Sequence, residues 1–264
     1  MFTDSHCHLS FPELASQIDA IRQAMEQAQV SRALCICTTL EEFGDVHGLA
    51  MQYPNFWASA GVHPDNEGVQ EPSLDDLVTL GALPKVVAIG ETGLDYYRLG
   101  DRTVQQMEWQ RDRFRVHIRA ARQLRKPLVI HTRSASDDTL QILREEGETG
   151  GAGCAGGVFH CFTETTDVAR AALDLGFYVS ISGIVTFKNA QQIRDVVAMV
   201  PMDRLLIETD SPYLAPVPFR GKTNNPSLVP YVARQIAEVK GVSVDDVAQH
   251  TSRNFEHLFP GVMQ

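Results

Sequence analysis

The stretch FTDSHCHL, residues 2–9, begins the chain as a strand-like run that carries two histidines. In a β-strand the side chains at i and i+2 point the same way and lie about 6.6 Å apart along the strand, so His6 and His8 can hold one metal ion between them. Cys7 faces the opposite side and is interpreted as a small buried thiol. Taken alone, such a pair is explained equally well by two histidines packed in the core, so the choice between a metal site and core packing depends on residues elsewhere in the chain.

Four further residues of metal-binding type stand at or just past the ends of other short apolar runs. They are Glu91 in VVAIGETG, His131 in LVIHTR, His160 in GVFHCF and Asp210 in LLIETD. Each run is typical of a buried strand, and a parallel barrel brings all its strand ends to one face. The sequence therefore predicts six ligands that converge on a metal centre, which indicates a metal-dependent hydrolase.

The pattern along the whole chain supports a barrel. Strand-like runs occupy residues 2–8, 33–38, 56–61, 86–91, 128–131, 158–161, 178–182 and 205–208. Amphipathic stretches lie between them, at 16–29, 101–126, 137–146, 167–175 and 189–200, and two more follow at 227–240 and 243–258. We predict an α/β fold, a TIM (β/α)8 barrel with an additional C-terminal helix, in which residues 1–264 form a single domain.

The amino-acid composition restricts the possible functions and the expected cellular compartment. Lys and Arg total 23 against 33 Asp and Glu, a formal net charge of −10, which argues against a protein that coats long duplex nucleic acid with a broad basic face. Five cysteines without a CxxC pair indicate neither a disulfide framework nor a zinc ribbon. Neither a signal peptide nor a run of about 18 apolar residues is found. We expect a cytoplasmic protein that does not enter the membrane.

The glycines around Glu91 suggest how a second ion is held. Gly90 and Gly93 flank this residue, an arrangement that lets a carboxylate emerge at a tight strand exit and bridge two cations. A buried acid paired with an arginine is the alternative for the motif taken alone. His131 and His160 are candidates for the second ion, because neutral imidazoles bind zinc, manganese and iron, and magnesium less readily. We expect two divalent ions, with Mg²⁺, Mn²⁺ and Zn²⁺ as the candidates.

Asp210, just past the eighth run, can contact the first ion and a water bound to it. Two cations about 3.5 to 4 Å apart lower the pKa of bound water far below that of bulk water, toward about 7, and clamp the oxygens of a phosphate. We therefore predict that Asp210 orients or deprotonates the attacking water, and that Glu91 and Asp210 are the catalytic residues. Glu208, two positions before Asp210, is a candidate for supporting a ligand from behind.

Four residues after other runs are candidates for substrate contacts: His63, Arg133, Arg220 and Lys222. Arg220 and Lys222 suit phosphate oxygens through forked and point-charge contacts. Arg133 could instead pair with a barrel carboxylate.

The arginine-rich stretch RDRFRVHIRAARQLRK, residues 111–126, alternates charged with apolar residues at helical spacing. This pattern predicts a solvated outer face of a helix in preference to a nucleic-acid surface, with His117 as a surface or packing residue.

The motifs together resemble one known family. DSHCHL (4–9), GVHP (61–64), GETGLDYYR (90–98), His131, FHCFTE (159–164), ISGIVTF (181–187) and ETDSPYLAPVP (208–218) with RGK (220–222) are similar, in order and across nearly the entire chain, to the TatD family of metal-dependent hydrolases, especially its YcfH-type branch. The resemblance implies a TIM barrel with two divalent metals. The characterised members of the family are mostly regarded as deoxyribonucleases, and some act as 3′ to 5′ exonucleases, so the resemblance also implies deoxyribonuclease activity.

The resemblance also assigns residues. It implies that His6, His8, Glu91 and Asp210 bind one metal and that Glu91, His131 and His160 bind the other, with the GVHP histidine, His63, near the site. Relatives often carry histidine where this chain has Phe219 and a charged residue where it has Thr223. Both positions lie in the last exit loop, so they concern substrate contacts and leave the metal ligands unchanged.

Three functions follow from these patterns. The first is a phosphodiesterase that cleaves DNA at single strands or ends, because a small positive site in an acidic protein suits a threaded terminus. The second is an enzyme that hydrolyses a small amide, ester or lactone, which would need an oxyanion hole in place of basic contacts. The third is a noncatalytic barrel scaffold, which the intact ligand set disfavours. The oligomeric state is not predicted.

Overall fold

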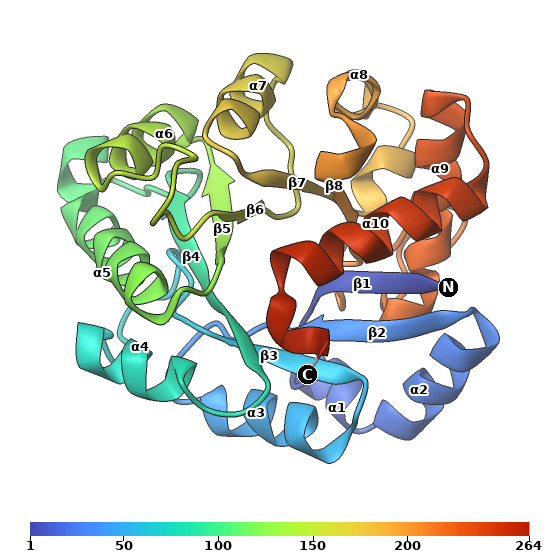
Figure 1. Cartoon of the computed structure of the whole chain (residues 1–264), viewed down its shortest axis with the longest axis horizontal. Helices are drawn as coiled ribbons and strands as arrows, with labels where there is room; N and C mark the ends of the chain where they lie inside the picture. The colour runs from blue at the N-terminus through green and yellow to red at the C-terminus, as the bar shows by residue number, and fades with distance from the viewer. Residues whose placement is uncertain (264) are drawn as a thin grey trace.

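The computed structural model describes residues 1–263 and is built around one sheet of eight parallel strands in chain order (Figure 1). The strands are β1 (Phe2–Cys7), β2 (Val30–Cys35), β3 (Phe56–Ala60), β4 (Val86–Asp95), β5 (Leu128–Arg133), β6 (Gly157–Phe159), β7 (Tyr178–Ile181) and β8 (Leu205–Ile207). Helices connect the strands and surround the sheet (Figure 1). The predicted (β/α)8 barrel is confirmed.

The barrel closes just beyond the ends of β1 and β8. The Asp210 amide donates a hydrogen bond to the His6 carbonyl oxygen at 3.0 Å, and the His8 amide donates to the Ser211 carbonyl oxygen at 2.8 Å. Cys7 and Ser211 form a parallel bridge between the two segments. Closure therefore places the first two histidines beside Asp210, although about two hundred residues separate them in the chain.

Ten α-helices occupy the part of the chain that the structure describes: α1 (Pro12–Ala15), α2 (Ile18–Gln27), α3 (Phe43–Gln52), α4 (Leu74–Gly81), α5 (Glu108–Leu124), α6 (Ser136–Glu145), α7 (Thr166–Asp174), α8 (Gln191–Met199), α9 (Val229–Lys240) and α10 (Val244–Leu258). Short 3-10 helices include η2 (Gly183–Thr186) and η4 (Pro226–Leu228). α3 contains Gly44 and Gly48, which lower helix propensity and weaken its sequence pattern. α4 begins with a capping box between Ser73 and Asp76.

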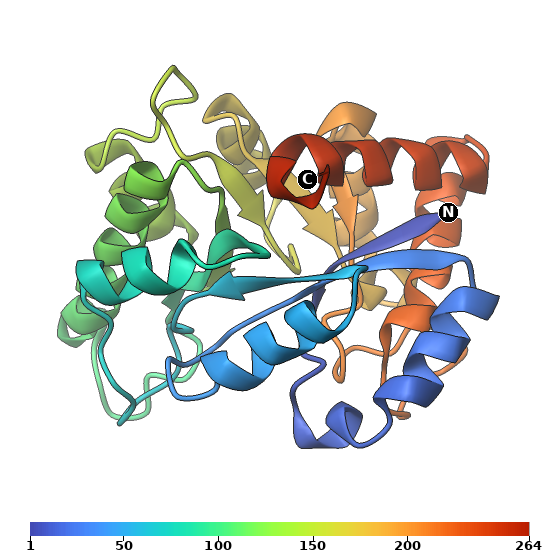
Figure 2. The ribbon, with the colours of Figure 1, turned by 60° about the horizontal axis from the view of Figure 1, so that its bottom comes forward.

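The last helix covers the end of the barrel at which the strands begin. α10 lies across this opening (Figures 1 and 2). Phe255 and Phe259 are fully buried there, in one cluster with inward-facing strand residues such as Leu34, Val129 and Leu206. This packing blocks the barrel interior from one side, so the opposite end, where the strands finish, is the open face.

Two expectations from composition concern the membrane and the thiols. Within residues 1–263 no helix has both the length and the apolar character that crossing a bilayer requires. All five cysteines are free thiols, in agreement with the lack of a disulfide pattern.

β4 is longer than predicted, and this changes where Glu91 lies. The sequence placed the strand end at Glu91, but the strand continues to Asp95, which pairs with Arg133 of β5. Gly93 makes this pairing possible, because a Cβ at this position would collide with the His131 carbonyl oxygen. Glu91 therefore projects from within a strand and has backbone support on both sides.

The arginine-rich helix α5 is not a uniformly solvated outer face, so this prediction was wrong for Arg113, whereas His117 is a packing residue, one of the two roles expected for it. The buried Arg113 guanidinium donates to the carbonyl oxygens of His63 and Asn66 at 2.7 and 2.9 Å and forms an ion pair with Glu71. His117 is also buried, and its Nε2 accepts a hydrogen bond from the Val62 amide at 3.0 Å. The inner side of α5 thus anchors the loop that carries His63.

The His117 contact predicts a pH-dependent stability. His117 Nδ1 donates to the Arg113 carbonyl oxygen while Nε2 accepts, so the folded state needs a neutral ring, and burial lowers the pKa of His117 to about 4. The unfolded chain binds this proton at its ordinary pKa of about 6.5. The unfolded state therefore holds more protons between these values, and stability falls as the pH drops below about 6.5. We expect the His117 contribution to fall by about 2 kcal/mol between pH 7 and pH 5.

The measurement is urea unfolding of the wild type and His117→Gln at both pH values. The variant should be less stable at pH 7, because the Val62 amide loses the acceptor that His117 Nε2 provides. The difference in unfolding free energy between variant and wild type should shrink at pH 5. His257→Gln, at an exposed position on α10, is the matched control. A difference that is the same at both pH values would contradict the assignment of a neutral, buried His117.

Candidate metal centre

The six predicted ligands meet at the open end of the barrel. They come from β1, β4, β5, and the segments that follow β1, β6 and β8: His6, His8, Glu91, His131, His160 and Asp210. Glu91 is buried with 2% of its surface exposed, and His6 is fully buried. The geometry brings these side chains together, as the strand-end argument requires.

Glu91 stands at the middle of this group, and its two carboxylate oxygens face different histidines. Oε2 lies 3.3 Å from His6 Nε2 and 3.9 Å from His8 Nε2. Oε1 lies 3.3 Å from His131 Nδ1 and 2.6 Å from His160 Nε2. One carboxylate therefore separates two sets of nitrogen donors, an arrangement that can bridge two cations.

Asp210 completes the set on the β1 side. Its Oδ1 lies 3.4 Å from His8 Nε2 and 3.5 Å from His6 Nε2. Its backbone has φ of 54°, a left-handed conformation that aspartate adopts more readily than most residues. The turn that follows is closed by a hydrogen bond from the Tyr213 amide to the Asp210 carbonyl oxygen at 3.0 Å. The carboxylate thus sits in a fixed orientation beside both histidines of β1.

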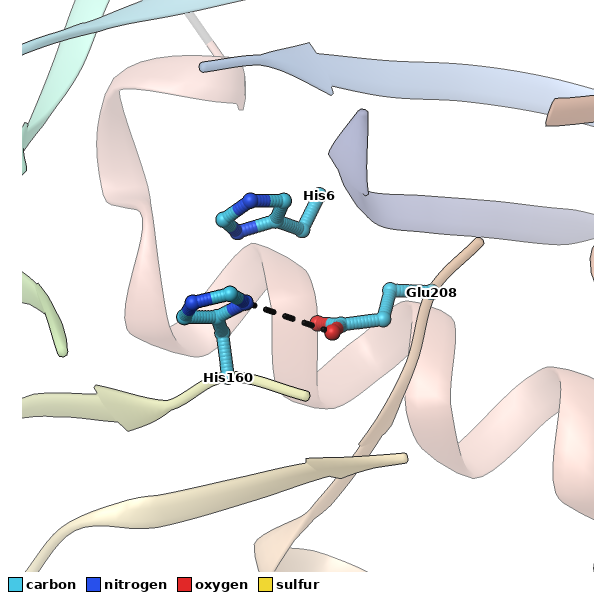
Figure 3. Close-up of side chains that lie close together, drawn as sticks. All are labelled: His6, His160 and Glu208. Atoms are coloured by element: carbon cyan, nitrogen blue, oxygen red, sulfur yellow. Dashed lines mark ion pairs between the residues drawn. The ribbon is translucent and has the colours of Figure 1, made fainter. Parts of the chain in front are cut away.

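Two carboxylates lie behind the histidines of the other set. Asp95 Oδ2 is 3.0 Å from His131 Nε2, which leaves Nδ1 directed at Glu91. Glu208 Oε1 is 3.5 Å from His160 Nδ1, and it accepts a hydrogen bond from the Cys161 amide at 2.6 Å. Figure 3 shows the Glu208 carboxylate directed toward the His160 ring. The His6 ring stacks on the His160 ring, with a centroid distance of 3.8 Å. Such contacts fix which nitrogen is free to bind.

The donor set fits divalent ions. Three groups have ligand atoms within 4.8 Å of one another: His6, His8 and Glu91; His63, Glu91 and His131; and His6, His160 and Glu208. His160 Nε2 lies 2.6 Å from Glu91 Oε1 but has no hydrogen bond of acceptable geometry among the described residues. A buried imidazole nitrogen crowded against a carboxylate oxygen without a hydrogen bond is costly unless a cation lies between the two atoms.

The electrostatics around Glu91 favour its ionised form. Burial alone would raise the pKa of Glu91, but His160, His63 and His6 surround it and hold that pKa well below its usual range. The same pairing acts on His160, whose pKa Glu91 and Glu208 keep well above its ordinary value although burial opposes this. Cation binding requires an ionised carboxylate and neutral imidazoles, so a bound cation would take the place of the proton that Glu91 and Glu208 favour on His160.

His63 faces the same carboxylate but is oriented as a donor. Its Nδ1 accepts a hydrogen bond from the Asp65 amide at 3.0 Å, so the neutral ring carries its proton on Nε2. That nitrogen lies 3.3 Å from Glu91 Oε1. His63 is therefore placed to donate a hydrogen bond into the site.

The metal cavity, as we call the space above these groups, has a volume of about 600 Å³. Of the four predicted substrate contacts, His63 and Arg133 line it. Arg220 and Lys222 do not, because the loop after β8 carries them into a neighbouring hollow of about 420 Å³. The two spaces share Tyr213 and Leu214 as a common wall.

Neither Arg98 nor Tyr213 was assigned a role at this site from the sequence, and for Asp95 two roles stayed open, support of the exit loop and a place in the lining of the cleft. Asp95 follows Glu91 by four positions along the same extended strand, so both side chains lie on one side, and strand periodicity could have revealed this. Arg98 and Tyr213 line the metal cavity from exit loops. The only feature of the sequence that could have indicated them is their position, since Arg98 follows Asp95 and Tyr213 follows Asp210 by three residues each.

A parallel barrel with histidines and carboxylates gathered at its strand ends is the arrangement of a metal-dependent hydrolase. The family model described as TatD related DNase matches residues 3–260. The chain therefore belongs to the TatD family of metal-dependent hydrolases.

Relatives and a solved structure agree with this assignment. The chain is 48% identical over 260 residues to a protein of Escherichia coli K12 named "Uncharacterized metal-dependent hydrolase YcfH", covering 97% of this chain and 94% of that protein. It is 32% identical over 262 residues to "3'-5' ssDNA/RNA exonuclease TatD" of Escherichia fergusonii, covering 97% and 98%. The crystal structure of YJJV, a TatD homologue from Escherichia coli K12, superposes with a TM-score of 0.89 at 30% identity and 98% coverage of both chains.

Proposed function

We propose that this protein is a deoxyribonuclease that hydrolyses phosphodiester bonds of single-stranded DNA or of DNA ends with two divalent ions, residues 1–264 acting as one catalytic domain. The observation that carries the proposal is the position of Glu91, whose two oxygens face separate sets of histidines. The relative named as a 3'-5' ssDNA/RNA exonuclease supports this choice of substrate class.

The ligand sets follow from the distances to Glu91. His6, His8 and Asp210 would hold one ion together with Oε2 of Glu91. The second set, His131 and His160, would hold the other ion together with Oε1. Bound in this way, the ions would polarise the phosphate and lower the pKa of a water molecule.

The protein groups around the ions have separate tasks. Asp210, which lies beside both histidines of β1, accepts the proton of the attacking water at its carboxylate. His63 donates its Nε2–H to a non-bridging phosphate oxygen, since its Nδ1 is already occupied by the Asp65 amide. Arg133, whose guanidinium carbon lies 3.6 Å from the centre of the Tyr97 ring, is held flat and presents its donors to the same phosphate.

Cationic groups at the cavity favour a phosphodiester over an amide, ester or lactone. Arg98 and Arg133 both line the metal cavity. A tetrahedral carbonyl intermediate is stabilised by one oxyanion hole, whereas a phosphodiester carries its charge before and during hydrolysis. Two arginines beside the metal ligands suit the second case.

The experiment is digestion of end-labelled single- and double-stranded DNA and RNA, with Mg²⁺, Mn²⁺ and Zn²⁺ supplied in turn to metal-stripped protein. We expect metal-dependent cleavage of DNA, fastest on single strands or from ends. A panel of small amides, esters and lactones is assayed in parallel. Turnover of a carbonyl substrate without cleavage of any nucleic acid would overturn the proposal.

A smaller prediction concerns Glu208. If it orients His160 through Nδ1, then Glu208→Gln weakens metal binding roughly 10- to 100-fold, as loss of such supporting contacts does elsewhere. Titration calorimetry with Zn²⁺ measures this, and Glu238→Gln on the outer face of α9 is the matched control. Wild-type affinity in Glu208→Gln would show that the carboxylate has only a structural role.

A further inference from the structure

The second hollow lies beside the metal cavity, across the loop that follows β8. We call it the side hollow; it is lined by residues that include Glu13, Phe187, Tyr213, Leu214, Arg220 and Lys222. Tyr213 and Leu214 line both spaces and so form the wall between them. Because the Tyr213 amide is hydrogen-bonded to the Asp210 carbonyl oxygen, this wall is attached directly to a residue of the metal centre.

Arg220 is held in the side hollow with its donors unused. Its guanidinium carbon lies 3.6 Å from the centre of the Phe187 ring, which is the distance of a flat stacking contact. Within residues 1–263 its side chain makes neither an ion pair nor a hydrogen bond, and the same is true of Lys222. Stacking fixes the plane of the guanidinium and leaves its N–H groups for a phosphate.

The loop that carries these cations is firmly anchored. Asn224 is fully buried, and its side-chain amide donates to the carbonyl oxygens of Thr209 at 2.9 Å and Tyr213 at 2.7 Å. The Val217 amide donates to Thr186 Oγ1 at 2.9 Å. The cations therefore stand on a preorganised segment, which lowers the entropic cost of binding a ligand there.

The charge and the wall of the side hollow point to one type of occupant. Among residues 1–263 the lining of the side hollow carries two cations, Arg220 and Lys222, and one acid, Glu13. The net charge of the whole chain is −10, so an anion is attracted locally and not by the protein as a whole. The Tyr213 side chain is 54% exposed at the wall. An exposed aromatic ring next to a cationic groove is the combination that binds single-stranded nucleic acid, because every unpaired base can stack.

We propose that the side hollow is a subsite for the nucleotide adjoining the scissile phosphodiester, in which Arg220 and Lys222 bind its phosphate and Tyr213 stacks on an unpaired base. The inference rests on the proposed nuclease function and adds a requirement to it. The substrate must carry a second phosphate beyond the bond that is cleaved, and a base free to stack. Single-stranded oligonucleotides meet both conditions, whereas a simple phosphodiester meets neither.

The kinetic test compares two substrates, single-stranded (dT)8 and bis(p-nitrophenyl) phosphate. For each protein the ratio of kcat/KM on (dT)8 to kcat/KM on the small diester is measured. We expect this ratio to fall about tenfold in Arg220→Gln and in Lys222→Gln, the effect of losing one charge-assisted contact. It should also fall in Tyr213→Ala. Arg170→Gln, at an exposed position on α7, is the matched control and should keep the wild-type ratio.

A binding test gives a readout that does not depend on turnover. Fluorescence anisotropy of labelled (dT)8 is titrated with metal-loaded Asp210→Asn protein at several salt concentrations, with and without Lys222→Gln. Removing one phosphate contact should reduce the slope of log affinity against log salt by about 1. Glu13→Gln should act in the opposite direction and tighten binding several-fold, because it removes a negative charge from the lining of the side hollow.

The outcomes separate the two proposals. If the wild type cleaves (dT)8 but Arg220→Gln and Lys222→Gln keep the wild-type ratio and salt slope, the subsite is wrong and the nuclease function stands. If the wild type hydrolyses neither substrate, the nuclease function fails, and the change in salt slope still decides whether the side hollow binds a phosphate.

Discussion

Replacing Glu91 by glutamine is expected to lower kcat/KM by roughly a thousand-fold or more, since the Lewis-acid and water-activating effects of a metal pair are each worth several kcal/mol. Glutamine preserves the shape of the side chain but is neutral, so it cannot balance the charge of two cations. The variant should therefore bind less metal at both positions. His8→Ala, by contrast, should lose ion binding chiefly on the β1 side, because His8 Nε2 lies beside Asp210 Oδ1 at 3.4 Å and Glu91 Oε2 at 3.9 Å.

The measurements are metal content after dialysis, turnover on single-stranded DNA, and thermal unfolding. Both variants should remain folded, because these side chains lie at the cavity and not in the apolar core around α10. Glu238→Gln serves again as the matched control. A Glu91→Gln protein with two tightly bound ions, or with full activity at trace metal, would contradict the bridging role.

The predicted ligands converge because of a property of the fold and not of local sequence. His131 and His160 each close an apolar run, and a parallel barrel places every such end on one face. Asp210 could be predicted for the same reason, since closure between β1 and β8 puts it beside His6. A pattern of short runs with polar ends is thus sufficient to predict both the barrel and which residues meet.

The sequence was less informative where the partner of a group lies far away in the chain. Glu91 lies within β4 because residues after it pair with β5, a tertiary contact that local patterning does not contain. Arg113 and His117 satisfy the charge periodicity of a surface helix, yet they bond to Glu71 and the Val62 amide. Helical periodicity reports which face is apolar, but it cannot report a polar partner about fifty residues earlier.

The path of the loop after β8 could not be predicted from the sequence either. Arg220 follows the eighth strand, as its place in the chain indicates, but it lines a hollow of its own and not the metal cavity. Its position depends on the hydrogen bonds of Asn224, which draw the loop back toward Thr209 and Tyr213. Loops follow such specific contacts, whereas strand and helix patterns follow regular periods.

Replacing Asp210 by asparagine is expected to separate catalysis from metal binding. Burial would raise the pKa of Asp210, but a hydrogen bond from His8 and the proximity of His6 and His160 lower it, so the carboxylate is ionised at neutral pH and can accept a proton. Asparagine keeps an oxygen that can contact an ion but cannot act as a base. We therefore expect kcat to fall about 10²- to 10⁴-fold, the usual contribution of a general base, with little change in KM.

The pH profile distinguishes this role from simple ligation. In Asp210→Asn the activity should rise with pH across the alkaline range, because hydroxide from solvent replaces the missing base, while the wild type should already be near its plateau. Metal content should stay close to that of the wild type and of Asp203→Asn, a control at an exposed position before β8. A variant that loses an ion and shows the wild-type pH profile would mean that Asp210 is a ligand only, and the proton would then have to leave the water directly to the solvent.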